Sequence, residues 1–304
     1  MSSEVEPLNR TVAGPLRSFL FTPGNHARRR EKALECGADA VIIDLEDAVA
    51  EAEKALARAA VAELLARPRR PRGYVRVNGF DSPWCYADLL AIVVPGLDGV
   101  MLPKVEGPEP LRALDWLLTQ LERERGLDAG RIELLGLVET ARGVERLAEI
   151  AAASPRLARL AFGVADYSLD LGLESTAGEA ELAWIRSKLV HCSRVAGLAP
   201  PVDSVVVQVR DAERFRESAR TGRSLGLRGK LCLHPDQVPI ANEVFSPSAA
   251  EVARARAIVA AFEAAEAAGV AAIRVGDEFV DYPVVARARG VLAIADLNEA
   301  TGRA

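Results

Sequence analysis

Short apolar runs alternate with amphipathic stretches along almost the whole chain. The runs predict strands at Ser18–Thr22, Ala40–Asp44, Tyr74–Asn78, Gly99–Leu102, Ile132–Val138, Leu160–Gly163, Ser204–Val207 and Gly229–Leu233. Helical patterns lie between them, at Arg28–Glu35, Glu51–Leu65, Pro110–Arg125, Val144–Ala152, Glu179–Ala196 and Asp211–Leu225. Strands that alternate with helices predict a parallel sheet covered by helices. Eight strand candidates favour a closed (β/α)₈ TIM barrel, an α/β fold, over the alternative of an open doubly wound sheet.

The pattern changes after the eighth strand candidate. An Ala-rich helix follows Ser248, which forms a capping-box sequence with Glu251, and it runs to about Gly269. A short extended piece, a turn and a last helix at about Pro283–Asp296 complete the chain. We therefore expect three parts: a polar N-terminal arm at 1–16, the barrel at 17–245, and a C-terminal helical extension or lid at 246–304.

Composition narrows the class of protein. The 304 residues carry a formal net charge of −5, which argues against a nucleic-acid partner. The four cysteines are far apart and form no C-x-x-C pair, as is typical of a reducing cytosol. No run is long and apolar enough to cross a bilayer, and the first residues do not resemble a signal peptide. We expect a cytoplasmic protein.

Two carboxylates follow strand-like runs at equivalent places. Glu139 ends the run Leu-Leu-Gly-Leu-Val, and Asp166 follows Leu-Ala-Phe-Gly-Val-Ala. Neighbouring strands lie about 5 Å apart, so two acids at adjacent strand ends can hold one divalent cation. Oxygen ligands in this small number suit Mg²⁺, which leaves positions for water and substrate. The alternative is that each acid caps the helix that follows it.

Arg76 lies inside an apolar strand pattern. Strand alternation places Tyr74, Arg76 and Asn78 on one face, and a cation that points into a barrel needs a partner. The partner could be a substrate carboxylate or thioester oxygen, held by the guanidinium fork. It could equally be Glu46 or Asp47, just beyond the second strand, and both arrangements can hold together.

Cations must also lie near the second strand. Asp44, Glu46 and Asp47 follow one another closely there, so they need partners such as Arg76, Lys104 or metal-bound water. Lys104 follows the fourth strand candidate, where it could bind substrate. The alternative for Lys104 is a simple salt bridge at the rim, which contributes little stability.

Taken together and in order, these motifs resemble the HpcH/HpaI aldolase and citrate lyase β-subunit family. The resemblance extends from about residue 17 to about residue 295. The matching segments are Arg17–Asn25, Ala38–Val49 with Lys54 and Arg58, Val75–Asn78, Leu102–Lys104, Val138–Thr140, Phe162–Asp166 and Gly229–Gln237.

The resemblance implies a (β/α)₈ barrel that assembles as trimers or hexamers. It implies Mg²⁺, with Mn²⁺ as a substitute, at Glu139 and Asp166, and Arg76 as the residue that binds the oxo or hydroxy acid and stabilises an enolate. In the malyl-CoA and citramalyl-CoA lyase branch, an Asp from a neighbouring subunit acts as acid/base. Phe279-Val280-Asp281-Tyr282-Pro283 matches that segment, so the role falls to Asp281. The sequence alone indicates an N-cap at Asp281.

The hypothesis that follows is a Mg²⁺-dependent carbon–carbon lyase. It would cleave or form a 3-hydroxyacyl-CoA such as malyl-CoA or citramalyl-CoA, with acetyl-CoA and a 2-oxo acid on the other side. The expected catalytic residues are Arg76, Asp281 and Glu46. Glu139 and Asp166 would bind both metal and substrate, and Lys104 would bind substrate. The expected contacts of the CoA diphosphate are Arg17, Arg28 and Lys54.

Two other readings remain open at this stage. The chain could be the β-subunit of a citrate lyase complex, which cleaves a citryl thioester on an acyl carrier protein. Ala165 and His234 differ from the residues expected of that subunit and favour a free-standing enzyme. A third reading, from another class, is a barrel that binds oxo acids or CoA esters without turnover.

Overall fold

The computed structural model describes residues 16–302, so the expected N-terminal arm at 1–16 lies almost entirely outside the described residues. The chain divides into two compact units, which meet in the sequence between Asn242 and Glu243. The boundary expected from the sequence, after Phe245, lies close to this division. Each unit is described by itself below.

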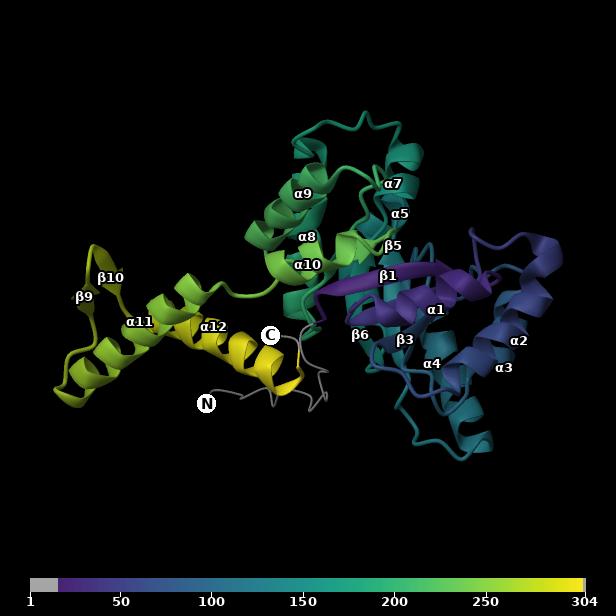
Figure 1. The fold of residues 1–304 in the computed structure, drawn as a ribbon, viewed down its shortest axis with the longest axis horizontal. Coiled ribbons are helices and arrows are strands. Elements are labelled where there is room, and N and C mark those ends of the chain that lie inside the picture. Colours follow the sequence, from purple (N-terminus) through teal and green to yellow (C-terminus); the bar gives the residue numbers. More distant parts are fainter. Residues whose placement is uncertain (1–15, 303–304) are drawn as a thin grey trace. The chain divides into compact units, whose positions relative to one another are not determined.

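The first unit is a closed barrel of parallel strands in the order β1 to β8, in which β8 pairs with β1 (Figure 1). The predicted α/β TIM-barrel fold is therefore confirmed. The strands are β1 (Ser18–Pro23), β2 (Ala40–Asp44), β3 (Arg72–Arg76), β4 (Gly99–Leu102), β5 (Glu133–Val138), β6 (Leu157–Phe162), β7 (Val202–Asp203) and β8 (Gly229–Cys232).

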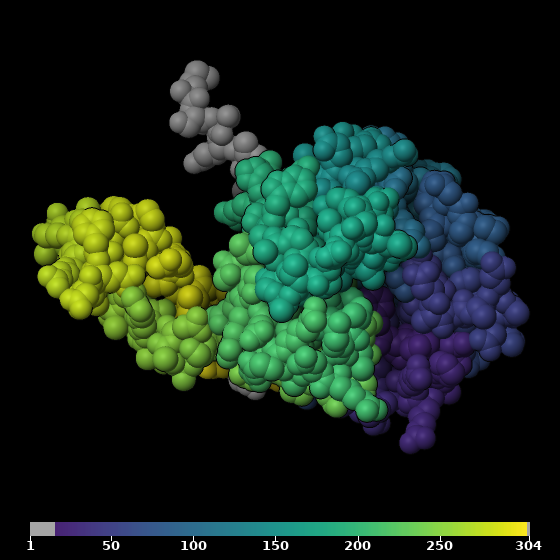
Figure 2. All heavy atoms as spheres, turned by 90° about the horizontal axis from the view of Figure 1, so that it is seen from above, coloured from purple at the N-terminus to yellow at the C-terminus, as the bar shows by residue number. Residues whose placement is uncertain are grey.

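Helices follow the strands and cover the outside of the barrel. In the space-filling view, the atoms of this unit, coloured from purple to green, form one continuous body (Figure 2). The helices are α1 (Ala27–Glu35), η1 (Glu51–Glu53), α2 (Lys54–Leu65), α3 (Cys85–Ile92), α4 (Pro108–Glu124), α5 (Ala141–Glu145), α6 (Leu147–Ala151), α7 (Val164–Leu171), η2 (Ala180–Leu182), α8 (Ala183–Val195), α9 (Ala212–Leu225) and α10 (Gln237–Val244).

Alternation along the strands builds two apolar layers. Side chains on one face of each strand fill the inside of the barrel, among them Phe19, Ile42, Tyr74 and Leu135. The other face packs against the helices in a larger cluster that includes Val41, Val75 and Leu134. Strand β2 is buried along its whole length for this reason. The strand ends are thereby fixed by packing on both sides, which gives the rim its rigidity.

The seventh strand prediction was wrong. Strand β7 is Val202–Asp203, whereas the expected strand was Ser204–Val207. Val202 is the residue that packs inside the barrel. The chain then leaves the sheet, because Ser204 Oγ accepts a hydrogen bond from the backbone N–H of Val164 at 2.9 Å, and Val207 is 57% exposed. The run of valines therefore forms a loop at the rim.

The second unit is a pair of helices and a hairpin. Helix α11 (Ala249–Ala267) begins with the predicted capping box, in which Ser248 and Glu251 exchange hydrogen bonds. The hairpin pairs β9 (Ile273–Val275) with β10 (Glu278–Val280), and α12 (Tyr282–Ala300) follows. Phe262, Val280 and Val285 form its core. No helix among the described residues is both long and apolar enough to span a membrane.

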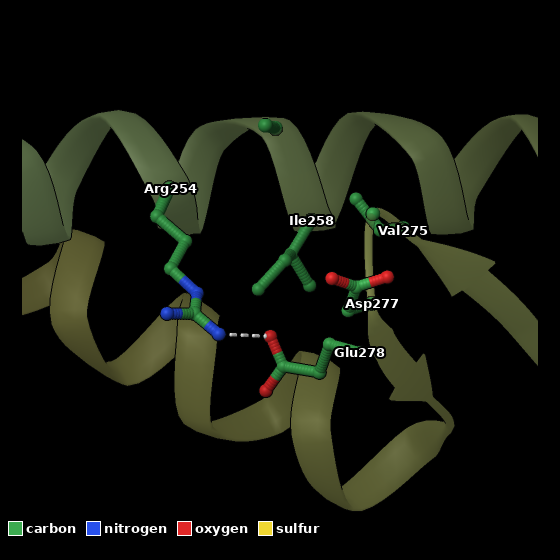
Figure 3. Close-up of a pocket in the computed structure, with 7 residues that line it drawn as sticks. Arg254, Ile258, Val275, Asp277 and Glu278 are labelled. Carbon is green, nitrogen blue, oxygen red and sulfur yellow. Dashed lines mark hydrogen bonds and ion pairs between the residues drawn. The ribbon is translucent and has the colours of Figure 1, made fainter.

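A pocket lies in this second unit, between α11 and the hairpin. It has a volume of about 510 Å³, and Arg254, Ile258, Val275 and Glu278 are among the residues that line it. Figure 3 shows Arg254 donating a hydrogen bond to Glu278, at 2.6 Å, across its floor. None of the residues expected to take part in catalysis lines this pocket.

Candidate active site

Charged side chains gather at the carboxyl ends of β2 to β6. Asp44 ends β2, Arg76 ends β3, Lys104 follows β4, Glu139 follows β5 and Asp166 lies in the first turn of α7 after β6. The parallel register brings these ends to one rim of the barrel (Figure 1). This is the end of a TIM barrel that carries its chemistry.

Arg76 is the cation at the centre of the group. Its Nε and Nη2 donate to the two oxygens of Asp44 at 2.8 and 2.7 Å, a bidentate fork between residues paired in register. Its Nη1 lies 2.9 Å from Glu46 Oε2 and 3.5 Å from Asp47 Oδ2. The alternative prediction, that Arg76 pairs with Glu46 or Asp47, is therefore confirmed for both acids. These acids hold the guanidinium at the edge of the barrel interior.

Glu46 is held in place by a buried lysine. The Nζ of Lys54 donates to the backbone carbonyls of Leu45 and Glu46 and to Asn78 Oδ1, at 2.7–2.9 Å. Lys54 is buried, and all three protons of its ammonium form hydrogen bonds within the protein. The prediction that Lys54 contacts the CoA diphosphate was therefore wrong. Lys54 orders the loop after β2 instead.

Glu46 is a buried carboxylate between two cations. Its Oε1 accepts a hydrogen bond from Lys104 Nζ at 3.1 Å, and its Oε2 forms an ion pair with Arg76, whose Nη1 lies 2.9 Å away. Burial raises the pKa of Glu46, against the opposing effect of the Arg76 cation. Each carboxylate oxygen of Glu46 therefore has a cationic partner within the site.

Glu139 is a buried carboxylate that has no cationic partner of its own. It is 2% exposed, and its Oε1 accepts a hydrogen bond from the backbone N–H of Lys104 at 2.9 Å. Among the residues that the structure describes, no lysine or arginine forms an ion pair with it. Burial raises the pKa of Glu139 to about 8, and the nearby charge of Asp166 acts in the same direction. Such a group would be stabilised by a divalent cation.

Gly163 makes room for this carboxylate. A Cβ at Gly163 would meet Oε2 of Glu139, so a side chain there would displace the carboxylate that reaches across the end of β6. The helix after Glu139 is capped by Thr140, whose Oγ accepts from the N–H of Gly143 at 3.1 Å. Glu139 is therefore free of the capping role that was its alternative interpretation.

Asp166 faces the same space from α7. Its side chain is 36% exposed, and its Oδ1 lies 4.0 Å from Lys104 Nζ. The N-cap position of α7 is Gly163, so Asp166 does not cap that helix. One carboxylate is thus buried and fixed, and the other is partly exposed and less constrained.

The donor set fits a magnesium ion. No group of three His, Cys, Asp or Glu side chains comes together as a complete ligand cage anywhere in residues 16–302. Glu139 and Asp166 instead offer two carboxylates, one of them buried and the other 36% exposed. Mg²⁺ prefers one or two carboxylates and fills its other positions with water and substrate oxygens.

The residues expected to bind CoA are separated by the fold. Arg17 precedes β1, at the opposite end of the barrel, where it is buried and its Nε donates to Asp39 at 2.9 Å. The prediction that Arg17 lies at the catalytic rim was wrong. Arg17 precedes the amino end of β1, and this strand runs from there to the rim at its carboxyl end. Arg28 lies exposed in the first turn of α1, directly after the loop at the carboxyl end of β1.

Asp281 stands at the start of α12 in the second unit. Its Oδ1 accepts from the N–H of Val284 at 3.3 Å, so it is the N-cap that the sequence alone indicated. The second carboxylate oxygen has no part in this cap. A capping aspartate can therefore still present an oxygen for proton transfer.

Sequence reasoning missed how Asp44 and Gly163 contribute. Asp44 was one of three acids expected to need cations, yet its pairing with Arg76 follows directly from the register of β2 and β3. Gly163 directly follows β6, at the place where the Glu139 side chain lies against the backbone. A glycine between a strand and an acidic turn was a usable signal for a close approach.

Comparison with known proteins decides the family. Residues 17–235 match the model of the HpcH/HpaI aldolase/citrate lyase family. The chain belongs to this family. Among curated relatives, the citrate lyase subunit beta-like protein of Deinococcus radiodurans is 40% identical, over 91% of this chain and 96% of its own length. The L-malyl-CoA/beta-methylmalyl-CoA lyase of Cereibacter sphaeroides is 35% identical over 95% of this chain and 97% of its own length.

A solved relative extends the likeness to the fold and its ligands. The protein CitE of Mycobacterium tuberculosis, in complex with magnesium, acetoacetate and coenzyme A, superposes with a TM-score of 0.76 and 32% identity. The match covers 93% of this chain and 98% of that one. The family expected from the sequence is therefore confirmed.

Proposed function

We propose that the protein is a Mg²⁺-dependent carbon–carbon lyase that acts on a 3-hydroxyacyl-CoA of the malyl-CoA or citramalyl-CoA type. The expectations of a lyase, of magnesium and of a coenzyme A thioester are confirmed by the relatives. The observation that carries the proposal is the rim of the barrel, where the four carboxylates of Asp44, Glu46, Glu139 and Asp166 lie near the two cations Arg76 and Lys104.

Glu139 and Asp166 would hold the metal. When bound, Mg²⁺ supplies a Lewis acid that polarises the oxygens of the substrate's hydroxy or oxo acid. Glu139 would be the fixed ligand, because packing and the Lys104 N–H hold its carboxylate. Asp166, with its greater exposure, can adjust to the ligand.

Arg76 would stabilise negative charge as it develops on the thioester or on the oxo acid. Its guanidinium is already oriented by the fork with Asp44, so little reorganisation is needed during the reaction. Glu46 would help to orient Arg76, because its Oε2 lies 2.9 Å from Nη1 of that guanidinium. Lys104, which bonds to the other oxygen of Glu46, would keep this carboxylate in place.

Asp281 would move the proton at the enolate carbon, acting on the site of a neighbouring subunit in a homotrimer or hexamer. Its capping bond with Val284 leaves one oxygen available. Asp281→Asn keeps the N-cap and removes the acid/base, because Asn caps helices as well as Asp does. We expect kcat to fall by about 10²–10⁴-fold with unchanged thermal stability. Loss of stability without loss of kcat would leave Asp281 as a cap only.

Arg28 remains the candidate contact for the CoA diphosphate, since α1 begins at the catalytic rim. Helix N-termini bind phosphate groups well. Arg28→Glu should raise the KM for a CoA substrate and leave metal affinity unchanged. A change in metal affinity would place Arg28 elsewhere. With its four free cysteines, the protein would work in the reducing cytoplasm.

The direct test is a product assay with the purified protein. Malyl-CoA, citramalyl-CoA and a citryl thioester are offered separately with Mg²⁺, with an EDTA control. Metal-dependent release of acetyl-CoA with glyoxylate or pyruvate supports the proposal and names the substrate. No cleavage of any CoA ester, with the metal shown to bind, overturns it.

A second candidate is the β-subunit of a citrate lyase complex. It is favoured by the citrate lyase subunit beta of Leuconostoc mesenteroides, which is 35% identical over 93% of this chain. Cleavage of the citryl thioester only when it is carried by an acyl carrier protein would select this candidate.

A further inference from the structure

Lys104 has a backbone conformation that its residue type disfavours. Its φ is +50°, and within residues 16–302 the only other non-glycine residue with a positive φ is Glu179. A lysine in the left-handed region costs free energy that a glycine would not. This conformation turns the backbone N–H of Lys104 onto Glu139 Oε1, at 2.9 Å. Backbone strain of this kind persists where the surrounding structure enforces it.

The side chain of the same residue reaches two other carboxylates. Its ammonium lies 3.1 Å from Glu46 Oε1 and 4.0 Å from Asp166 Oδ1. The side chain is 44% exposed, so the ammonium is solvated on one side and can move. One residue therefore contacts three acids of the site, two through its ammonium and one through its backbone.

The two ammonium contacts differ in their rigidity. Glu46 is buried, and its backbone carbonyl is bound by Lys54, so its carboxylate stays in place. Asp166 is partly exposed and forms only the longer contact with Lys104. A divalent cation at Asp166 would repel an ammonium that lies about 4 Å from the same oxygen. The hydrogen bond with Glu46 holds the ammonium at this place.

We propose that Lys104 is a positioning residue whose ammonium, held on Glu46 and 4.0 Å from Asp166, opposes a divalent cation at the Glu139–Asp166 pair and so tunes the affinity of the site for its metal. This inference rests on the proposed function. Lys104 lowers that affinity, because its positive charge repels an ion bound to the same Asp166 oxygen. It also ties metal binding to Glu46, which contacts Arg76 at 2.9 Å, so binding of the ion alters the surroundings of the residue that receives the substrate anion.

The test compares metal affinity among full-length variants without substrate. Mn²⁺ binding is measured by electron paramagnetic resonance and Mg²⁺ binding by calorimetry, each for the wild type, Lys104→Met, Lys104→Gly and Lys104→Arg. Lys104→Met removes the ammonium at nearly constant length, and we expect about three- to tenfold tighter metal binding. Lys104→Gly also removes the backbone strain and should bind at least as tightly. Lys104→Arg keeps the charge and should stay within about twofold of the wild type.

Lys188→Met is the matched control, since Lys188 is another solvent-facing ammonium, placed over the Trp184 ring on α8. It corrects for the change in net charge and should leave affinity unchanged. Damage to the site would weaken metal binding, so tighter binding cannot come from misfolding. Unchanged or weaker binding in both Lys104→Met and Lys104→Gly overturns the inference. A wild type that binds no Mn²⁺ or Mg²⁺ would instead remove the proposed function itself.

Discussion

The two ends of the barrel both carry acidic and basic side chains, but they differ in how many donors each carboxylate has. Strand β5 begins at Glu133 and is followed by Glu139, and strand alternation turns both side chains inward. At the amino end, Glu133 accepts hydrogen bonds from Arg72 Nη1 at 2.9 Å and from the Tyr74 hydroxyl at 2.5 Å. At the carboxyl end, Glu139 accepts a hydrogen bond from the backbone N–H of Lys104, and no side chain within residues 16–302 donates to it.

The same contrast holds along β3. Arg72 and Arg76 face the same interior from opposite ends of one strand. Arg72 serves two acids, Glu133 and Asp98, and those acids are also held by other donors of the protein. Arg76 stands among acids that outnumber the cations beside them. A satisfied cluster stabilises the fold, whereas an excess of buried carboxylate charge calls for a ligand.

The largest expected effect comes from removing the buried carboxylate at the catalytic end. Glu139→Gln keeps the shape of the side chain and its bond with Lys104 but loses the charge that holds the metal. We expect kcat/KM to fall by at least about 10³-fold, measured as acetyl-CoA release at saturating Mg²⁺. Activity within tenfold of the wild type would move the metal away from Glu139.

Arg76→Lys tests the shape of the central cation while the charge is kept. A lysine cannot form the two-pronged contact with Asp44, so its ammonium would not be held at the same place. We expect kcat to fall by about 10²–10³-fold with metal affinity unchanged, as for the loss of an oriented oxyanion donor. Steady-state kinetics together with Mg²⁺ calorimetry check both parts.

The third prediction concerns stability and pH. Burial holds the pKa of Glu139 at about 8, above its value in the unfolded chain. A group whose pKa is raised by folding supports the folded state fully below its unfolded pKa, near 4.3, and this support is lost as pH rises towards 8. In EDTA, Glu139→Gln should therefore be more stable than the wild type by about 4 kcal/mol at pH 7.5, with less than about 1 kcal/mol of difference at pH 4.5. Urea unfolding at the two pH values measures it. A difference that does not grow with pH contradicts the assignment of the shift to burial.

The smallest effect is expected at the amino end. Tyr74→Phe deletes the hydroxyl that donates to Glu133 and leaves the ring packed beside Phe19. We expect a loss of about 1 kcal/mol in the free energy of unfolding and a kcat within about twofold of the wild type. A larger loss of kcat than of stability would show that the two ends of the barrel are coupled.

Much of the fold could be predicted from the sequence, because few folds are compatible with apolar strand patterns that alternate regularly with helical patterns. Strand β2 and strand β4 coincide with their predicted residues, since buried apolar runs end sharply there. The shift of β7 could not be predicted, because a run of valines is compatible both with a strand and with a loop at the rim. Helix α3 was missed because it is only 8 residues long, too short for a clear helical period.

The sequence predicted those residues of the site that lie at or just after the ends of strands. Glu139, Asp166, Arg76 and Glu46 come together because each follows a parallel strand or ends one. The roles given to Arg17 and Lys54 failed for a different reason. The sequence shows that a side chain is basic, but it does not show the partners of that side chain. In the folded chain, Arg17 bonds to Asp39 and Lys54 bonds to Asn78.

The most direct test of this account is a Mg²⁺ titration by calorimetry of the wild type, Glu139→Gln and Glu133→Gln. The two variants make the same chemical change at opposite ends of one strand, on the same inner face. The account predicts that Glu139→Gln loses Mg²⁺ binding while Glu133→Gln binds like the wild type. Equal binding in both variants, or loss in Glu133→Gln alone, would contradict it.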